Sequence, residues 1–408
     1  MNYLPNLFNL LSNKFYFKIS YLLISLFTIT ILRFIPGVHI INKILILWGL
    51  FLIPVDFFLK LSKKHRPLKV EIIIYTLLIS TLIFTIIKYP TIDNLKGVIL
   101  NFIILTIFFD INTDKNLNTL KKELNLFCYI YIGITLLLSI VSLAIIFSRE
   151  KIWISETLNG EYLVHSFTSA FLNENSLGIS SVISFMISIY ITSYIKNKNT
   201  VKKAYKIIIF FNIILQSTTL ILSNSRSVYL AILAFSLILI LIYSKNILFK
   251  IIIISFSILS SVILFITKSS SINSFLTGRD TLWKASLNIV KSSPIFGLGS
   301  TALTNSLDEL NLLTLGRVHN IYLEIAATNG LITLFLFILI LISTYLFILN
   351  KLNILPSKDR FNYGILCSST ISILFINLVE SNLFYIMSFI SIIFWTILSY
   401  TFSILHKV

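Results

Sequence analysis

The chain has 408 residues, of which 56% are hydrophobic and only 12% are charged, and its formal net charge at pH 7 is +17. A soluble domain carries about 25% charged residues, so this composition excludes a soluble globular protein and indicates a protein embedded in a membrane. The two cysteines, Cys128 and Cys367, lie inside apolar runs, which argues against a disulfide framework or a zinc site.

Apolar runs of membrane-spanning length recur along the whole chain. A helix needs about 20 apolar residues to cross the hydrocarbon core of a bilayer, which is about 30 Å thick. The pattern therefore predicts an all-α, polytopic membrane protein with twelve transmembrane helices. The spans are expected near 16–32, 40–59, 70–87, 97–109, 126–147, 176–195, 205–222, 227–243, 248–267, 331–349, 362–379 and 383–404.

The distribution of basic residues predicts the orientation. Most of the 33 Lys and Arg residues fall in alternate connections between spans, and this is better explained by the positive-inside rule than by nucleic-acid binding. Both termini are then cytoplasmic. The two long connections, 148–175 and 268–330, face outward, and loops of this length usually carry function. Three regions are expected: a nine-span membrane region over 1–267, an extracytoplasmic loop with an interfacial helix over 268–330, and a three-span region over 331–408.

The seventh span carries a polar stripe that ends at an arginine. Its members occur at helical spacing on one face and are Asn212, Gln216, Thr219, Ser223 and Arg226. Asn, Gln, Ser and Thr inside a membrane ordinarily form hydrogen bonds between helices. Arg226 lies in a short turn between two spans, where an arginine is costly and is a candidate for function.

The long outer loop begins with "LTGRDTLWKASLNIVKSSPIFGLGS". Helical spacing from Asp280 or Thr281 onward places Leu282, Trp283, Ser286, Leu287 and Val290 on one face. This predicts a helix lying in the membrane interface, with Trp283 at the level of the lipid headgroups. The helix should end at Pro294, and Gly297 and Gly299 permit a tight turn. Arg279 could anchor this helix or bind substrate.

The last polar segment is "GRVHNIYLEIAATNG", Gly316 to Gly330, directly ahead of an apolar run. A lone histidine is more often a polar tip at an interface than a catalyst. Arg317 stands two residues before His319, however, so a cation and a potential base are presented together. Asn320 and Glu324 form an i, i+4 pair if the segment is helical. Because no second histidine or carboxylate pair with metal-ligand spacing accompanies His319, no metal is expected.

The segments "SNSRSVYLAIL", "TGRDTLWKASLNIVKSSPIFGLG" and "HNIYLEIAATNG" together resemble, in this order, the signature regions of the O-antigen ligase and O-antigen/capsular polysaccharide polymerase superfamily. "FLNENSLGIS" resembles the Asn-rich start of a mid-chain span in that family. The similarity covers roughly 170–340. The residues that match are Asn173, Asn175, Arg226, Gly278, Arg279, Trp283, Pro294, Gly297, Gly299, His319, Asn320 and Gly330.

The resemblance implies a GT-C-like, metal-independent and cofactor-free membrane glycosyltransferase. Its donor would be a glycan on undecaprenyl diphosphate in the outer leaflet of the cytoplasmic (inner) membrane. Its acceptor would be a sugar hydroxyl, on a second lipid-linked repeat unit for a polymerase or on lipid A-core for a ligase. Besides the bilayer, the flippase and the chain-length regulator of the same pathway would be partners, and nucleic acid would not.

The chemistry of this reaction suggests roles for the candidate residues. Arginines can neutralise the departing diphosphate through bidentate, charge-assisted hydrogen bonds, and the candidates are Arg226, Arg279 and Arg317. A histidine has an ordinary pKa near 6.5, which suits His319 to take the proton of the acceptor hydroxyl. Glu324 or Asn320 would orient the ring of His319. The other supporting candidates are Trp283, Asn224 and Asn175, and the displacement would invert the anomeric configuration.

Two other classes of function compete with this reading. A flippase for lipid-linked oligosaccharides would line a midplane cavity with ionisable groups, whereas the arginine and histidine candidates here gather on one side. A scaffold or receptor would be expected to carry soluble domains. Between the two enzyme classes, a polymerase is favoured over a ligase. Polymerases of this superfamily are encoded one per glycan cluster and vary widely in sequence, so a divergent member is expected to be a polymerase.

Overall fold

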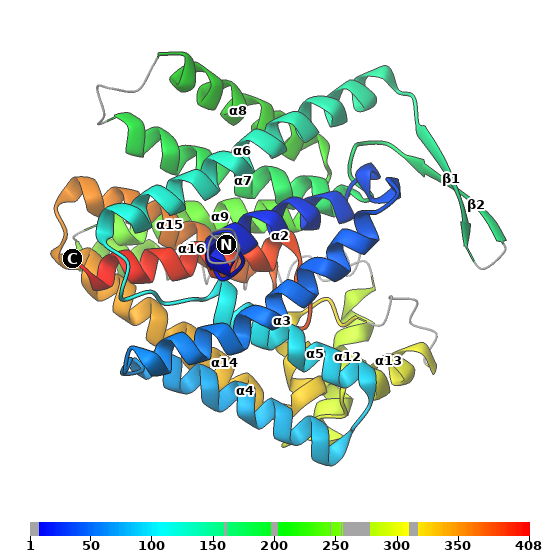
Figure 1. The fold of residues 1–408 in the computed structure, drawn as a ribbon. Coiled ribbons are helices and arrows are strands. Elements are labelled where there is room, and N and C mark those ends of the chain that lie inside the picture. Colours follow the sequence, from blue (N-terminus) through cyan, green and yellow to red (C-terminus); the bar gives the residue numbers. More distant parts are fainter. Residues whose placement is uncertain are drawn as a thin grey trace, which may run out of the picture.

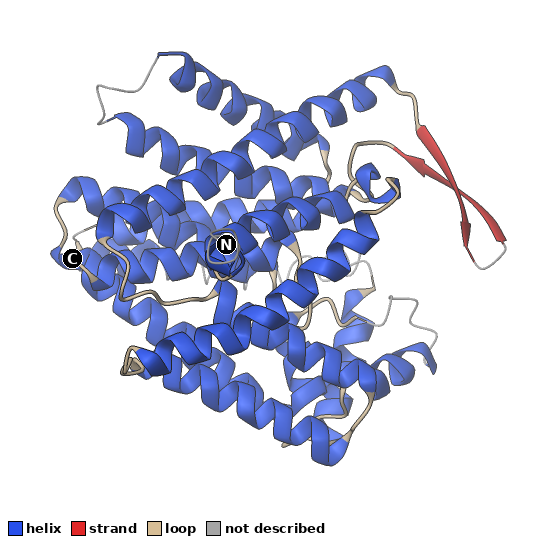
Figure 2. Ribbon diagram, viewed as in Figure 1, coloured by secondary structure: helices blue, strands red, loops and turns tan. Residues whose placement is uncertain are grey.

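The computed structural model describes residues 8–158, 161–196, 203–244, 246–253, 255, 278–309 and 317–408. Within these ranges the chain is helical apart from one β-hairpin (Figures 1 and 2). Eight helices are long and apolar enough to cross a membrane. They are α3 (Val38–Ser62), α4 (Lys69–Lys88), α6 (Leu117–Ser148), α7 (Glu174–Lys196), α8 (Lys203–Leu222), α9 (Arg226–Tyr243), α14 (Ile321–Ile354) and α16 (Phe389–His406). The protein is thus all-α, polytopic and membrane-spanning.

Seven further helices accompany them, besides short helical stretches at 8–11 and 247–253. They are α2 (Lys14–Thr28), η1 (Ile31–Phe34), α5 (Ile92–Ile103), η2 (Ile104–Phe108), α12 (Arg279–Ser292), α13 (Ser300–Glu309) and α15 (Ser357–Ile376). The hairpin consists of β1 (Ile152–Leu158) and β2 (Glu161–Phe167), which pair antiparallel with Ile152 opposite Phe167.

The prediction of twelve spans was too high for the described residues. Of the four predicted spans that do not qualify, 16–32 corresponds to α2, which has only 15 residues, and 97–109 is divided between α5 and the π-helical turn η2. The span 362–379 corresponds to α15, whose buried serines and threonines lower its hydropathy. Most of the ninth predicted span, 248–267, lies outside the described residues. Side chains on these shorter or more polar helices are buried against other helices. Hydropathy and length alone therefore do not decide whether such a helix belongs to the membrane bundle.

The connections alternate between two ends of the helix bundle (Figure 1). One end, here called the hairpin end, carries the hairpin, α12, α13 and the connections 223–225, 317–320 and 377–388. The opposite end, here called the basic end, carries the connections 63–68, 109–116 and 355–356. At the basic end Lys63 pairs with Asp114 at 2.8 Å, which joins two connections far apart in sequence. The alternation agrees with the predicted separation of loops into two sets.

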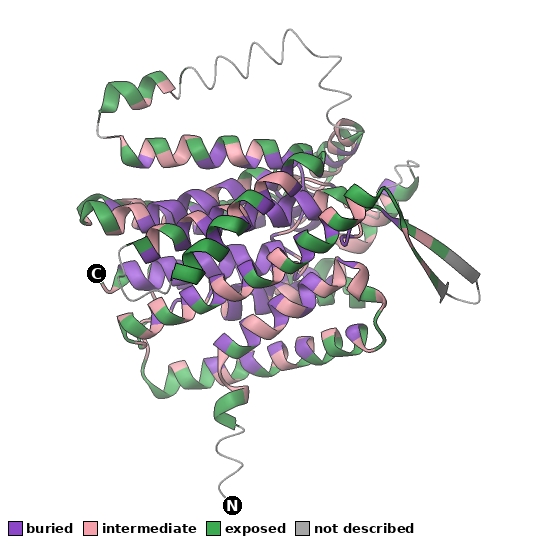
Figure 3. Cartoon of the chain, turned by 90° about the horizontal axis from the view of Figure 1, so that it is seen from above, coloured by how far each residue is buried: buried purple, intermediate pink, exposed green. Residues whose placement is uncertain are grey.

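Among the membrane-spanning helices burial is greatest for α16 and α7, which lie in the middle of the bundle (Figure 1), and the buried residues gather at the centre of the molecule (Figure 3). Buried polar side chains join α6, α7 and α8. Asn212 of α8 donates to Ser188 of α7 at 2.8 Å, Ser139 of α6 donates to Gln216 of α8 at 3.1 Å, and Ser181 of α7 bonds to Thr219 of α8 at 2.9 Å. The polar stripe on the seventh predicted span therefore forms interhelical hydrogen bonds, as expected for such residues inside a membrane.

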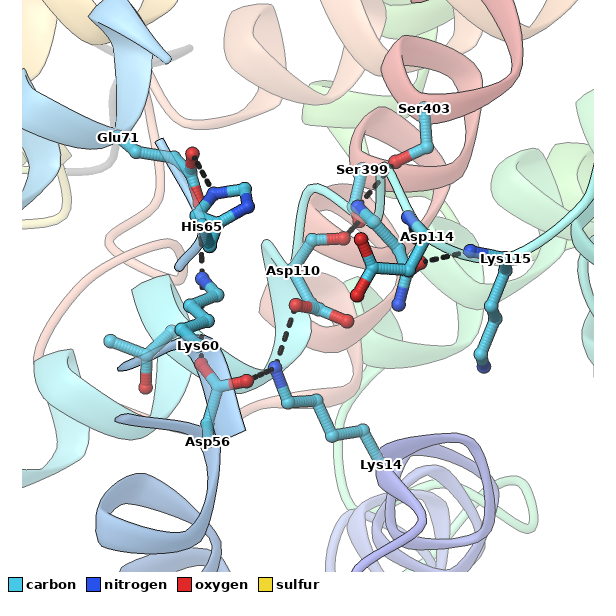
Figure 4. A network of polar contacts seen from close by, with 12 residues as sticks. Lys14, Asp56, Lys60, His65, Glu71, Asp110, Asp114, Lys115, Ser399 and Ser403 are labelled. Atoms are coloured by element: carbon cyan, nitrogen blue, oxygen red, sulfur yellow. Dashed lines mark hydrogen bonds and ion pairs between the residues drawn. The ribbon is translucent and has the colours of Figure 1, made fainter. Parts of the chain in front are cut away.

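An ion-pair network closes the basic end (Figure 4). Lys14 of α2 contacts the carboxylates of both Asp56 and Asp110. Lys60 is 3.0 Å from Glu71, whose other oxygen is 2.9 Å from His65. All of these groups except Glu71 line an open cavity of about 330 Å³. Because its cations and carboxylates pair with one another, we interpret the network as a tie between α2, α3, α4 and the 109–116 connection.

Candidate functional site

The glycine-rich segment 294–299 supports the site because it pairs with a kink in α14. Gly330 lies inside α14 with φ of 83°, a left-handed conformation that interrupts the helix. The N–H groups of Leu298 and Gly299 donate to the carbonyls of Ala327 and Thr328, both at 2.9 Å, and Leu331 donates to Pro294 at 2.7 Å. The carbonyls that the kink releases are thus satisfied by the loop.

Glycine is required where these two backbones meet. A Cβ on Gly330 would lie 1.9 Å from the carbonyl oxygen of Ile295, and one on Gly297 would lie 2.5 Å from that of Thr328. The predicted turn at Gly297 and Gly299 is confirmed, since both have positive φ. The same contacts explain why Gly330 must be a glycine.

Two tyrosines hold the kink from outside. Asn329 donates to the hydroxyl of Tyr89 at 3.0 Å and accepts a hydrogen bond from Tyr385, while Tyr89 donates to the carbonyl of Phe296 at 2.9 Å. Burial raises the pKa of Tyr89 to about 12, and burial next to the charge of Glu324 raises the pKa of Tyr385 well above its usual range. Both tyrosines therefore stay protonated and act as donors.

Helix α12 begins at Arg279 and ends before Pro294, as predicted. Of the residues predicted to share one face, Leu282 and Ser286 are buried, whereas Leu287 is 45% exposed. Trp283 packs against a small cluster that α12 shares with α13 and α14. Its indole nitrogen is buried without a hydrogen-bond partner in the described part of the chain. Trp283 therefore packs within this cluster. The prediction had placed it at the level of the lipid headgroups.

His319 lies in a turn held from both sides. Its φ of 52° is left-handed, an uncommon conformation for a non-glycine residue and one that is found preferentially at functional sites. Asn320 caps α14 by accepting from the N–H groups of Tyr322 at 3.0 Å and Leu323 at 3.1 Å. The N–H of Ile321 donates to the carbonyl of Glu380 at 3.1 Å. The turn is thus tied to the 377–388 connection.

One carboxylate, that of Glu380, joins three predicted site residues. Its Oε1 accepts from Arg279 at 3.0 Å and from Asn175 at 3.3 Å, and its Oε2 is 3.4 Å from Nδ1 of His319. The side chain of Glu380 is 10% exposed and that of His319 is 31% exposed, so the cluster is sheltered but open to a ligand. Residues from α7, α12, the 317–320 turn and the 377–388 connection meet here.

Arg317 lies beside this cluster but pairs with a different carboxylate. Its Nη2 is 3.3 Å from Oε1 of Glu324, whose Oε2 accepts from the N–H of Val318 at 3.4 Å. Glu324 thus holds Arg317, and Asn320 caps the helix. The expectation that one of these two residues orients the His319 ring does not match their contacts, because the carboxylate next to the ring belongs to Glu380.

Arg226 is the first residue of α9 and is exposed. The preceding Asn224 is also exposed and left-handed, with φ of 51°. Ser225, between them, donates to Oδ1 of Asn175 at 3.1 Å, and Asn175 donates in turn to Glu380. The turn that carries Arg226 is therefore linked through Asn175 to the cluster around Glu380.

The sequence reasoning missed Glu380. It lies in a short connection that the predicted spans reduce to three residues, with no matching motif around it. A signal was available, since an isolated carboxylate between two apolar spans is expensive and calls for a partner.

The site offers cations, a potential base and an acidic partner, with Arg279 and His319 at the sheltered Glu380 cluster, Arg317 held by Glu324, and Arg226 exposed on the linked turn. Three guanidinium groups and one imidazole accompany two carboxylates, Glu324 and Glu380, so the cluster retains positive charge. Each guanidinium has five N–H donors, and Arg279 and Arg317 contact Glu380 and Glu324 through Nη2. The remaining donors can bind an anion. In the described residues, no group of three or more His, Cys, Asp or Glu side chains is arranged to hold a metal ion.

Comparison with known proteins agrees with this arrangement. Residues 211–338 match the family model described as O-antigen ligase, and this range includes Arg226, Arg279, Arg317, His319 and the Gly330 kink. A search of curated proteins finds no match to the chain. Residues 211–338 of this multi-pass membrane protein thus correspond to an O-antigen ligase domain, the domain of membrane glycosyltransferases of the ligase and polymerase type that act on a lipid-linked glycan.

Proposed function

We propose that the protein is a polysaccharide polymerase of the O-antigen or capsule type. It transfers a glycan from undecaprenyl diphosphate to a sugar hydroxyl of another lipid-linked repeat unit. The observation that carries the proposal is the convergence of Arg279, His319 and Asn175 on Glu380, because this reaction needs an anion site and a base side by side.

The arginines bind the diphosphate of the donor. Arg279 and Arg317 are partly buried, at 17% and 26% side-chain exposure, so their hydrogen bonds to phosphate are less screened than at an open surface. Arg226 contributes from the exposed first turn of α9, where the helix N-terminus also favours an anion. Charge that develops on the leaving group is stabilised by these preorganised donors.

His319 is the general base. The acceptor hydroxyl attacks the anomeric carbon as the bond from this carbon to the diphosphate oxygen breaks, and the hydroxyl proton passes to His319. The glycan is then joined to the acceptor, the lipid leaves with its diphosphate, and attack opposite the leaving group inverts the anomeric configuration. Glu380 is a positioning residue that holds the ring and stabilises the imidazolium that forms.

Binding of the diphosphate gives Glu380 a second role. Phosphate oxygens compete with its Oε1 for Arg279, and as Arg279 turns to the phosphate, the carboxylate is left to His319. The base would then be strongest when the donor is bound.

We further propose that the hairpin end faces outward from the cytoplasmic membrane and that both termini are cytoplasmic. The excess of Lys and Arg in the connections of the basic end supports this orientation.

The glycan profile of a deletion strain tests the function. Single repeat units still attached to the envelope are expected for a lost polymerase. Unattached lipid-linked chains would instead identify a ligase, and donor held on the inner leaflet would identify a flippase.

Complementation then tests the site. His319→Ala and Arg279→Ala should fail to restore polymer, whereas His39→Ala and Arg33→Ala, at exposed positions near the hairpin end, should restore it. Normal polymer from His319→Ala at normal expression would refute the assignment of the base.

A further inference from the structure

Two adjoining cavities lie at the hairpin end next to the Glu380 cluster. One, of about 370 Å³, is formed by the segment after β2 and the start of α7. The other, of about 240 Å³, lies between the end of α6, the start of α7 and the end of α8. Both are lined by Thr168, Ser169 and Glu174, so they form two lobes of one hollow, here called the α7 hollow. Together they reach the size of an ordinary ligand site.

The α7 hollow is continuous with the catalytic cluster at each lobe. Asn175 lines the first lobe and also donates to Glu380 at 3.3 Å. Ser223 lines the second lobe and lies three residues before Arg226. A molecule seated in the hollow therefore extends directly toward His319 and the arginines.

The lining is suited to a hydroxyl-rich ligand. Thr168 and Glu174 are exposed, and within the described residues their side chains make no hydrogen bond or ion pair with the protein. They present a hydroxyl, which donates and accepts, and a carboxylate, which accepts strongly. Apolar side chains complete the walls: Phe167 and Phe171 in the first lobe, and Ile145, Ile146, Leu177 and Leu222 in the second. An apolar ligand would leave these polar groups unpaired, whereas sugar hydroxyls would pair with them.

We propose that the α7 hollow binds the saccharide chain of the acceptor. This inference rests on the proposed function and adds a substrate subsite to it. The acceptor is favoured over the donor because the hollow meets the cluster through Asn175, whose partner Glu380 faces the base with its other carboxylate oxygen. The base must touch the acceptor hydroxyl. A chain held along α7 delivers its terminal hydroxyl to His319 while the diphosphate occupies the arginines.

Steady-state kinetics with the purified full-length protein in lipid nanodiscs tests the subsite. Donor and acceptor are lipid-diphosphate-linked saccharides, and the acceptor is supplied with one or with several sugar residues. Glu174→Gln and Thr168→Val should raise the KM for the longer acceptor about fivefold to tenfold per lost hydrogen bond. The kcat, the KM for the donor and the KM for the single-sugar acceptor should change less than twofold. Thr168→Trp, which fills the hollow, should raise the acceptor KM further.

The control is Glu309→Gln, the same chemical change at an exposed position at the end of α13, which should alter no parameter. Unchanged acceptor KM in Glu174→Gln and Thr168→Trp would overturn the subsite, and so would a rise confined to the donor KM. His319→Ala separates the two proposals. If it abolishes transfer while the hollow variants behave as wild type, only the subsite fails; if it retains transfer, the proposed function fails.

Discussion

Replacing Glu380 by glutamine removes one negative charge and almost no volume. The carboxylate of Glu380 accepts from Arg279 and Asn175 with one oxygen and faces His319 with the other. The amide has only one oxygen that can accept. The change therefore separates charge from packing. We expect Glu380→Gln to fold and to lose most of its activity.

The magnitude follows from the contacts of the carboxylate. A hydrogen bond to a charged group contributes about 1.5–3 kcal/mol and a neutral one about 0.5–1.5 kcal/mol. The side chains of Arg279 and Glu380 are 17% and 10% exposed. After screening by solvent, replacing the charged hydrogen bond by a neutral one should lower the folding stability by about 1 kcal/mol. In the reaction the charge also stabilises the imidazolium of His319. We expect a loss of about 1.4–2.8 kcal/mol of transition-state stabilisation, which is a fall of about 10- to 100-fold in kcat/KM.

The assay measures kcat and KM with purified protein across pH, together with the thermal midpoint in detergent. A purely structural role would lower the midpoint and leave the pH profile of the remaining activity unchanged. A positioning role changes the pH profile of the remaining activity, because the imidazolium that forms during transfer loses its anionic partner. In the double variant with His319→Ala the second change should cost little, since the two residues act as one unit. Glu309→Gln is the matched control.

Activity of Glu380→Gln within twofold of wild type, at normal folding, would refute the role of the carboxylate. Fully additive losses in the double variant would refute the link between Glu380 and His319.

Three further outcomes are expected. Gly330→Ala should destabilise the protein by about 3 kcal/mol or more, measured by thermal unfolding, because its Cβ would lie 1.9 Å from the oxygen of Ile295 in a left-handed backbone; Gly133→Ala, with open space around it, should be nearly neutral. Asp110→Asn should destabilise by about 3 kcal/mol at neutral pH, because it leaves Lys14 without one of its two carboxylates. Burial alone would raise the pKa of Asp110, but neighbouring lysines hold this pKa well below its usual range. The carboxylate therefore contributes to stability above the unfolded-state pKa, which is near 4, and this contribution is lost as the pH falls below that value. Equal stability of the wild type and Asp110→Asn at pH 7 would contradict this. Transfer should continue at an unchanged rate in excess chelator, measured as product per minute, because arginines take the place of a metal.

Much of the site could be predicted because its features depend on short segments of the sequence. The Gly-x-Gly turn, the end of α12 before Pro294 and the polar stripe from Asn212 each depend on residues a few positions apart. Backbone sterics and helical periodicity act at that range. The glycines signalled a close approach of two backbones, although the partner of that approach was the kink of α14.

The parts that sequence reasoning missed depend on contacts across the chain. Glu380 acquires its role from Arg279, 101 positions earlier, and from Asn175, 205 positions earlier. Contacts between residues so far apart in sequence cannot be predicted from local sequence patterns. Glu324 was expected at the His319 ring because the two are near in sequence, yet its carboxylate turns to Arg317. Helices α2 and α15 were taken for ordinary spans because hydropathy does not record which helices lie at the centre of the bundle.

The amino-acid sequence was sufficient to predict the membrane class, the alternation of loops between two ends and the identity of most polar groups at the hairpin end. These follow from hydrophobic run length, charge placement and local backbone preference, which are properties of neighbouring residues. Only the tertiary structure decided that His319, Arg279 and Asn175 share the carboxylate of Glu380 and that a hollow along α7 opens beside them. The physical reason is that helix packing sets which residues meet, and packing depends on the fit of whole helix surfaces, which no single segment specifies.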